Sequence, residues 1–410
     1  MAPATPPPTT PPTALPPTRA VVGQLIRYAA HYRKHFFDAV RDELALQGIE
    51  YRVLYGEPWA DEQPIGGVVE LPWATKVKTR HLSIAGKTVL WHGAQRAATG
   101  CDVIMLEQQV KAVANYLFLV RRLVGGPRII LTGHGRNHQT DDHTTIVERS
   151  KEWLTRRADW FFAYTENSAD IVAEMGFPRE RVTVFTNALD NNARRAQIEA
   201  TTETELATLR SELGLGAGPI GAYIGRIYPD KRPDFLIDAA LELRALQPDF
   251  ELLIIGDGND RAAIDAAAAE HPWIHDVGAR FDSDLVRHAL LADVILNPGA
   301  IGLVAIDSLA LGRPIVTVAD TGHGPEMAYL KPDFDCIVLD REVTPQQYAT
   351  TVSELFDDRP RLVQLQQQAR SRAHEFSMED MVATYAAGFV TALETLGIIE
   401  PTPAPDPNDA

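Results

Sequence analysis

The stretch GAYIGRIYPDKRPDFLIDA, residues 221–239, sets the pattern for the second half of the chain. An apolar run that ends at Gly225 predicts a strand, and the run that starts at residue 234 has the spacing of an amphipathic helix. Between them lies a short polar loop with Arg226 and Lys231. Arginine offers a fixed fork of donors and lysine a compact charge, so the two can converge on one anion. The alternative is an ordinary strand–helix loop with two solvated cations.

The same alternation of short apolar runs and amphipathic segments extends along most of the chain. Four runs in the second half predict strands, namely PIGAYIG, FELLIIG, DVILNPG and RPIVTVA. Six more in the first half are VVGQLIR, YRVLYG, CDVIML, RIILTG, WFFAYT and RVTVFTN. Helical segments between such runs favour parallel sheets that are covered on both faces. We therefore predict an α/β protein with two doubly wound, Rossmann-like domains that face a central cleft at the carboxyl ends of their strands.

Length and composition support two domains. A chain of 410 residues is long enough for two hydrophobic cores rather than one. Both ends are rich in proline, which favours extended conformations that cannot close a core. The predicted segments are a disordered tail at 1–19, a first domain at 20–190, an interdomain crossover at 191–217, a second domain at 218–375, a C-terminal helix at 376–398 and a second disordered tail at 399–410.

Charge and cysteine content exclude several classes of protein. The formal net charge of −16 argues against a nucleic-acid-binding protein, which would carry a basic surface. Cys101 and Cys336 lie far apart and neither belongs to a CxxC motif, so we predict neither a disulfide framework nor a zinc site. The first residues lack the features of a signal peptide, and no apolar run has the length of a transmembrane helix. We expect a cytoplasmic protein.

A second motif, NPGAIGLVAIDSLALGRPIVTV, covers residues 297–318. A turn is predicted up to Gly302, and Leu303 and Val304 begin an amphipathic helix. The free amides in the first turn of a helix provide a phosphate site. Asp307 lies one turn further along, where its carboxylate can accept hydrogen bonds from ribose hydroxyls. The alternative for Asp307 is a solvated helix residue.

These two motifs resemble a known family. From residue 225 to residue 340 the sequence is similar to the nucleotide-binding half of the retaining family 4 glycosyltransferases of the GT-B fold. The G-R-x4-K loop matches, and so do the strand LLIIGDG, Val277-Gly278 at the expected base-binding loop, and the helix GLVAID. The resemblance implies a GT-B architecture and a nucleotide-diphosphate sugar as co-substrate. It also implies retention of the anomeric configuration, without a metal ion or another cofactor.

The sequence departs from the family at two positions. The E-x7-E pattern of the family places its first glutamate, which addresses the donor sugar, at Gly299 and its second at Asp307. The form PGxxGLxAI resembles a branch of the family in which small residues replace the first acid. Asp307 keeps a carboxylate on a side chain that is one methylene shorter. The resemblance therefore leaves the donor sugar open.

The resemblance assigns two further residues to the donor sugar. His134 follows the run IILTG, where the family carries a histidine that faces the sugar, although a histidine after a strand is more often structural. Glu326, in DTGHGPEMAYL, matches a glutamate that receives a sugar hydroxyl, with helix capping as the alternative. His138 and residues 141–143 carry metal-like ligands, but their spacing fits no strong template and we predict no metal site.

The acceptor side is predicted in the first domain. Tyr32 and Arg33 lie in the loop after the first strand, where a solvated helix start is the alternative. Glu166 ends a later strand and either faces the acceptor or caps the next helix. A basic patch that either meets an anionic lipid-linked acceptor or forms a solvated loop comprises Lys76, Lys78, Arg80 and His81.

We therefore predict a metal-independent glycosyltransferase in which His134, Arg226 and Lys231 are catalytic. The two cations and a helix N-terminus neutralise the diphosphate as it leaves. The expected partners are a nucleotide-sugar donor and a glycan, lipid-linked or small-molecule acceptor, and not nucleic acid; peripheral contact with the inner face of a membrane stays open. The rivals are a sugar-nucleotide 2-epimerase and a catalytically silent nucleotide-sugar-binding protein.

Overall fold

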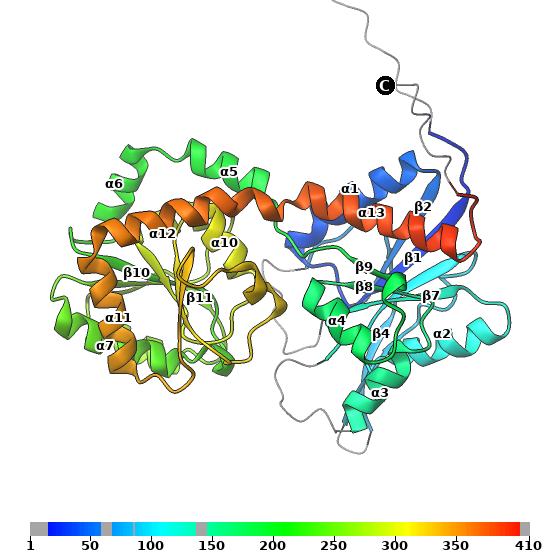
Figure 1. The fold of residues 1–410 in the computed structure, drawn as a ribbon, viewed down its shortest axis with the longest axis horizontal. Helices are drawn as coiled ribbons and strands as arrows, with labels where there is room; N and C mark the ends of the chain where they lie inside the picture. Colours follow the sequence, from blue (N-terminus) through cyan, green and yellow to red (C-terminus); the bar gives the residue numbers. More distant parts are fainter. Residues whose placement is uncertain (1–14, 59–67, 85–86, 137–145, 402–410) are drawn as a thin grey trace, which may run out of the picture.

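The computed structural model describes residues 15–58, 68–84, 87–136 and 146–401. Two α/β domains lie side by side, each built on a twisted parallel sheet with helices on both faces (Figure 1). The predicted fold class is confirmed. All ten apolar runs that predicted strands form strands of these two sheets.

The first domain contains a seven-stranded sheet in the order β3-β2-β1-β6-β7-β8-β9, in which all neighbours are parallel. Polar residues at the ends of β6 and β7 therefore reach the same edge of the sheet. A separate antiparallel hairpin, β4-β5, was not predicted. The strands are β1 (Ala20–Ile26), β2 (Ile49–Tyr55), β3 (Thr75–Lys76), β4 (Thr79–Ile84), β5 (Lys87–His92), β6 (Val103–Glu107), β7 (Arg128–Gly133), β8 (Trp160–Ala163) and β9 (Val182–Val184). The helices are η1 (His31–Arg33), α1 (Lys34–Leu46), α2 (Val113–Leu123), α3 (Ile146–Thr155), α4 (Glu166–Glu174) and η2 (Arg179–Arg181).

The second domain contains a six-stranded parallel sheet in the order β12-β11-β10-β13-β14-β15. Its order reverses between β10 and β13, and such a switch point opens a ligand crevice at the carboxyl ends of the strands. The strands are β10 (Ile220–Arg226), β11 (Glu251–Asp257), β12 (Ile274–Asp276), β13 (Val294–Leu296), β14 (Ile315–Val318) and β15 (Cys336–Leu339). The helices are η3 (Pro229–Lys231), α7 (Pro233–Leu246), α8 (Ala262–Glu270), α9 (Asp282–Leu290), α10 (Val304–Leu311), η4 (Pro325–Tyr329), α11 (Pro345–Asp357), α12 (Arg359–Arg372) and η5 (Ala373–Phe376).

The chain passes between the domains twice. After β9 it enters α5 (Asn191–Ala200) and α6 (Glu203–Glu212), which pack against the core of the second domain. It returns after η5. The buried amide of Asn191 ties the two passages together, because its Nδ2 donates to the carbonyl oxygens of Ala373 at 2.9 Å and Phe376 at 2.5 Å.

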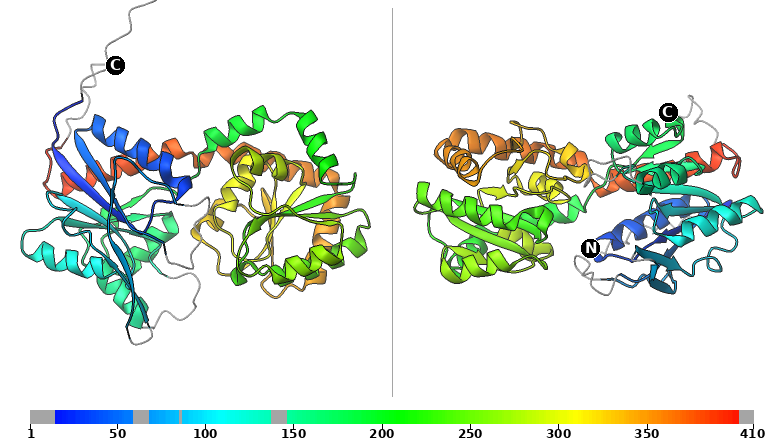
Figure 2. Two further views of the ribbon diagram at one scale, coloured as in Figure 1. Left: turned by 180° about the vertical axis from the view of Figure 1, so that it is seen from behind. Right: turned by 90° about the horizontal axis from the view of Figure 1, so that it is seen from below.

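The last helix, α13 (Met378–Thr395), belongs to the core of the first domain. The Phe389 ring lies 4.9 Å from that of Phe162, and the Tyr385 ring lies 5.1 Å from that of Phe36. Figure 2 shows α13 beside the first domain and α12 beside the second in both views. The apolar pattern of this helix predicted burial but not which domain it would cover.

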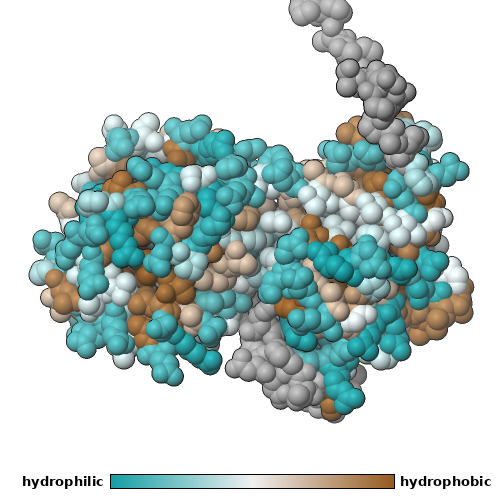
Figure 3. Space-filling model, viewed as in Figure 1, coloured by the Kyte–Doolittle hydropathy of each residue, from teal (hydrophilic) through white to brown (hydrophobic). Residues whose placement is uncertain are grey.

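The face of the molecule shown in Figure 3 is mainly hydrophilic, with smaller hydrophobic areas such as one over α2 at the lower right. At the end of α2, Leu123 and Val124 remain 80% and 81% exposed. Within the described part of the chain, no helix combines the length and the apolar character needed to cross a bilayer.

Candidate functional site

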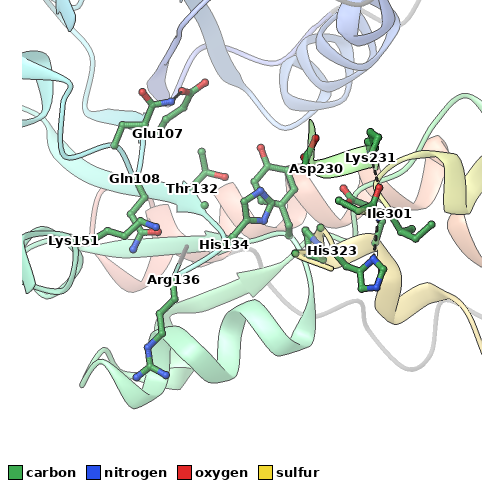
Figure 4. A pocket seen from close by; sticks show the side chains of 18 residues that line it. Glu107, Gln108, Thr132, His134, Arg136, Lys151, Asp230, Lys231, Ile301 and His323 are labelled. Carbon is green, nitrogen blue, oxygen red and sulfur yellow. Dashed lines mark hydrogen bonds between the residues drawn. The ribbon is translucent and has the colours of Figure 1, made fainter. Parts of the chain in front are cut away.

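A cleft of about 560 Å³ lies where the two sheets face each other. The first domain contributes the carboxyl ends of β6, β7 and β8 together with Lys151 of α3. The second domain contributes η3, residues 300–301 and residues 322–326. Figure 4 shows His134 from the first domain opposite Lys231 and His323 from the second. The cleft therefore brings together three predicted site residues that lie far apart in the sequence: His134, Lys231 and Glu326.

Lys231 ends η3 and is held close to the motif around residue 300. Its Nζ donates to the carbonyl oxygen of Ala300, whose own amide donates to the carbonyl of Asp230 at 2.8 Å. Burial lowers the pKa of the Lys231 ammonium, and the carboxylates of Asp230 and Glu326 oppose this effect. A desolvated ammonium gains more from an arriving anion than a solvated one does. Lys231 is thus well suited to a diphosphate.

Gly299 occupies a place where no side chain fits. A Cβ at this position would lie 2.4 Å from the carbonyl oxygen of Asp230 and 2.5 Å from Cα of Lys231. Both are backbone atoms, so they cannot rotate away as the end of a flexible side chain would. The glycine at the first acidic position of the family is therefore explained by the close approach of η3.

His323 fixes the turn that precedes α10. Its Nδ1 accepts a hydrogen bond from the amide of Ile301 at 3.0 Å (Figure 4), and its Nε2 lies 2.9 Å from the carbonyl oxygen of Val318. These partners assign the proton to Nε2. Burial lowers the pKa of His323, which the hydrogen bond to Val318 opposes. His323 is therefore a neutral residue that positions residues 300–302.

His134 lies directly after β7, on the opposite wall of the cleft. Its ring stacks on that of Tyr164, with 4.2 Å between the ring centroids and 29° between the planes. The following turn is held by Gln108, whose Oε1 accepts from the amide of Gly135 at 3.1 Å. The stacked imidazole of His134 lines the cleft, and a neutral imidazole can hydrogen-bond to a ligand there.

Glu326 is only 6% exposed and is held from the other domain. Its Oε1 accepts from Nδ2 of Asn187 at 2.8 Å, and Oδ1 of Asn187 accepts from Nη2 of Arg33 at 2.7 Å. This contact explains Glu326 better than helix capping, because Gly324 precedes η4 without a side-chain cap.

A smaller cavity of about 180 Å³ adjoins the cleft inside the first domain. Three residues line both spaces: Glu107, Thr132 and Tyr164. Arg33, predicted for the acceptor side, lines the smaller cavity. For Tyr32 the structure gives only its place in η1.

Several predicted residues lie outside the walls of the cleft. The Arg226 guanidinium rests over the Tyr228 ring, 4.5 Å from its centroid. Asp307 forms a largely buried ion pair with Arg194 at 2.9 Å, and burial raises its pKa while Arg194 opposes the rise. Glu166 is exposed and pairs with Arg179 at 2.6 Å, while Thr165 caps α4. In each ion pair one carboxylate oxygen is already engaged by an arginine, so a hydroxyl group would have to bond to the other oxygen or compete with the arginine.

The remaining predicted residues shape the backbone. Gly225 at the end of β10 has a φ of 138° and Gly278 after β12 has a φ of 70°, values that favour glycine. Leu303 precedes the first residue of α10, Val304, so the predicted helix start is confirmed. A Cβ at Gly302 would meet open space.

Metal ligands do not gather in the part of the chain that the structure describes. There, no group of three or more histidine, cysteine, aspartate or glutamate side chains is placed to hold an ion. His138 and residues 141–143 lie outside the described residues.

Family comparisons agree with the geometry of both domains. Residues 36–192 match the model of Glycosyltransferase Family 4, and residues 208–372 match that of Glycosyl transferases group 1. Both domains have the GT-B fold. The two matches cover the GT-B cleft from both sides and leave α13 outside.

Named relatives align with about three fifths of this chain. The 2-deoxystreptamine glucosyltransferase of Streptomyces kanamyceticus is 28% identical over 256 residues, which are 60% of this chain and 62% of that protein. The D-inositol 3-phosphate glycosyltransferase of Nocardia farcinica is 30% identical over 259 residues, which are 58% of this chain and 55% of that protein. The matches thus span less than two thirds of the length of these relatives.

Solved structures share the GT-B fold at low identity. HepE of Anabaena, in complex with UDP, aligns with a TM-score of 0.65 and 15% identity over 91% of this chain and 100% of that chain. WaaG, a glycosyltransferase involved in lipopolysaccharide biosynthesis, aligns with a TM-score of 0.60 and 15% identity over 89% and 98%. At such identity these likenesses show the fold alone.

The sequence analysis missed several residues of the GT-B cleft. Gln108, Arg136 and Lys151 line it, and Asn187 holds Glu326. Gln108 closely follows the predicted run CDVIML, and Asn187 is the last residue of the predicted run RVTVFTN, so polar residues at the ends of these runs were the available signal. Lys151 lies on α3, away from the end of any predicted strand, so its position in the sequence did not indicate that it would line the cleft.

Proposed function

We propose that this protein transfers a sugar from a nucleotide diphosphate to a small-molecule acceptor, with retention of configuration and without a metal ion. The observation that carries the proposal is the cleft in which Lys231 and Glu326 of one domain face His134 of the other. A cation beside a helix start suits a diphosphate, and a carboxylate with an imidazole suits sugar hydroxyls.

The proposed reaction breaks the bond between the anomeric carbon and a diphosphate oxygen while an acceptor oxygen bonds to that carbon. Negative charge grows on the leaving diphosphate. The Lys231 ammonium and the first amides of α10 stabilise this charge in a partly desolvated place. Arg226 adds a second cation once it leaves the Tyr228 ring. The acceptor attacks from the face that the diphosphate leaves, and the departing oxygen takes its proton.

The acceptor is proposed to be a small polar ring rather than a polymer. The adjoining cavity of about 180 Å³ is partly open, is lined largely by aromatic side chains, and is of a size that suits a small ring rather than a polymer. Relatives named for 2-deoxystreptamine and for D-inositol 3-phosphate support this choice. A cytoplasmic location is part of the same proposal.

Thermal-shift measurements with nucleoside diphosphates and their sugars test the donor site. We expect UDP or another nucleoside diphosphate to raise the melting temperature equally with and without EDTA. Lys231→Met should remove most of this rise, because the ammonium is lost. Lys331→Met, a lysine of the same domain that lies over the Phe334 ring, is the matched control and should keep it.

The stereochemistry of the product tests the reaction. Incubation with a donor and a panel of small cyclitols should yield a glycoside with the donor's anomeric configuration in its NMR couplings. An inverted product would contradict retention. Interconversion of the donor without an acceptor would point to an epimerase instead, and binding without turnover to a silent binder; the named relatives, which are transferases, favour neither.

A further inference from the structure

Asn187 connects the two domains inside the cleft. It lies just beyond β9, is 4% exposed, and uses both ends of its amide. Oδ1 accepts from Arg33 at 2.7 Å, and Nδ2 donates to Glu326 at 2.8 Å. Arg33 borders the smaller cavity, whereas Glu326 lines the main cleft. The buried amide of Asn187 therefore connects a residue of the smaller cavity with a residue of the main cleft.

We propose that Asn187 is a positioning residue that holds the Glu326 carboxylate toward the donor sugar only while the two domains are closed. The proposal rests on the proposed function, since it gives Glu326 a donor to hold. Arg33 holds the other end of the Asn187 amide on the side of the proposed acceptor cavity. The hydrogen-bonded chain of Arg33, Asn187 and Glu326 is called the link below.

The chemistry of the three side chains explains why an asparagine is needed. A guanidinium can only donate and a carboxylate can only accept, so a neutral residue between them must offer one acceptor and one donor. The amide of Asn187 does so and leaves no polar atom of its own unpaired in a buried place. An aspartate would place a second negative charge against Glu326.

The second carboxylate oxygen of Glu326 faces the glycine-rich turn. A Cβ at Gly324 would lie 2.7 Å from Oε2, and Gly324 lines the cleft. With Oε1 fixed by Asn187, Oε2 remains on the side of the donor space. Since Asn187 and Glu326 belong to different domains, opening of the cleft breaks their bond and frees the carboxylate to rotate.

The link predicts a functional coupling between acceptor and donor. An acceptor that contacts Arg33 stabilises the position of its guanidinium, which donates to Asn187. Asn187 in turn holds Glu326. The donor sugar is then held more firmly when an acceptor is bound, which limits transfer to water. Loss of the link should therefore weaken donor binding and raise the share of donor that is hydrolysed.

Asn187→Asp tests the proposal against a matched control. Asn192 donates to Glu379 at 2.7 Å on the exposed surface, so Asn192→Asp creates the same pair of facing carboxylates outside the cleft. At pH 8 we expect Asn187→Asp to lower kcat/KM for the donor by about 10–100-fold, mainly through KM, while Asn192→Asp stays at the wild-type value.

The pH dependence of kcat/KM in Asn187→Asp distinguishes a positioning role of Asn187 from a general loss of structure. Two facing carboxylates take up a shared proton as the pH falls, so the loss in Asn187→Asp should shrink between pH 8 and pH 6. Charged and titratable groups near this pair include Arg33, Lys231 and Tyr329, with His323 lining the same cleft. They are unchanged in the variant, so the wild-type profile corrects for them. A loss that is the same at both pH values would contradict the proposal.

A charge-swapped double variant covers the case in which Asn187→Asp is unstable. Asn187→Asp with Glu326→Gln restores the net charge and both hydrogen bonds but removes the carboxylate from the donor side. We expect it to recover the wild-type melting temperature and radius of gyration without recovering kcat/KM. Full recovery of kcat/KM would overturn the positioning role.

The outcome also distinguishes this proposal from the proposed function. If wild-type protein binds no nucleotide and transfers no sugar, the proposed function fails. X-ray scattering then still tests the link itself, because Asn187→Ala should open the domains and enlarge the radius of gyration relative to Asn192→Ala. Unchanged dimensions, or wild-type KM and hydrolysis in Asn187→Asp, would overturn it.

Discussion

Gly299 lets two loops of the second domain approach more closely than any side chain would allow. Sequence comparison alone reads the glycine as the loss of a sugar-binding acid. The structure adds a steric reason, since η3 brings the backbone of Asp230 and Lys231 into the space of a Cβ. The same approach places the Lys231 ammonium beside Ala300. The position of the Lys231 ammonium therefore depends on a residue without a side chain at position 299.

Gly299→Ala tests this contact. We expect the added methyl group to displace η3, to lower the free energy of unfolding by about 1–3 kcal/mol and to weaken nucleoside diphosphate binding. Urea unfolding and calorimetric titration measure the two effects. Gly302→Ala is the control for stability, because a Cβ there meets nothing within 4 Å. Equal stability of the two variants would contradict the steric explanation.

The β4-β5 hairpin carries a histidine that should make the first domain sensitive to acid. His92 at the end of β5 is 3% exposed, and its pKa is lowered to about 4 by burial, with smaller contributions from His81 and Arg27. In the unfolded chain its pKa is near 6.5. The folded state thus binds fewer protons than the unfolded state between these values, so stability is complete above pH 6.5 and falls toward pH 4.

His92→Leu should remove this part of the pH dependence. The lowered pKa corresponds to about 3 kcal/mol of unfolding free energy that wild type loses between pH 6.5 and pH 4. Urea unfolding at several pH values, read as the difference between wild type and variant, isolates the contribution of His92 from that of other groups. If the free energy of unfolding of wild type and of His92→Leu changed in parallel with pH, the assigned contribution of His92 would be contradicted.

Elements with a strong apolar run could be predicted from the sequence, and weakly patterned ones could not. The strands β10 and β11 are almost wholly buried on both faces, so they appear as continuous apolar runs. The β4-β5 hairpin reads TRHLSI and KTVLWH, in which polar and apolar residues mix, and β12 has three residues. Such segments depend on their neighbours for stability rather than on their own pattern.

The whole molecule is held together by α13, which returns from the second domain to complete the first. Phe389→Ala should cost about 3–5 kcal/mol, because the ring is fully buried against Phe162 and Tyr385. We expect calorimetry to show the first domain melting earlier while the second keeps its transition. Phe334→Ala is the control, since that ring is 38% exposed. A uniform shift of both transitions would contradict the assignment of α13 to the first domain.

Contacts between the two domains are the part of the candidate site that could not be predicted from the sequence. His134, Lys231 and Glu326 could be located because each follows a recognisable motif. The bond between Asn187 and Glu326 joins residues 139 positions apart in different domains. It depends on how the two domains meet, which no local pattern encodes. The ion pair of Asp307 with Arg194 likewise depends on the packing of α5 against α10.

The return of α13 also has a consequence for biosynthesis. Residues of β1, α1 and β8 leave the ribosome early, but the aromatic helix that covers them follows about 200 residues after β9, which takes roughly 10–40 s at common rates of translation. During that interval Phe36 and Phe162 lack their partner and can attract chaperones. The second domain is continuous in sequence and can close its core without waiting. The half of the protein that is made first is therefore the last to finish folding.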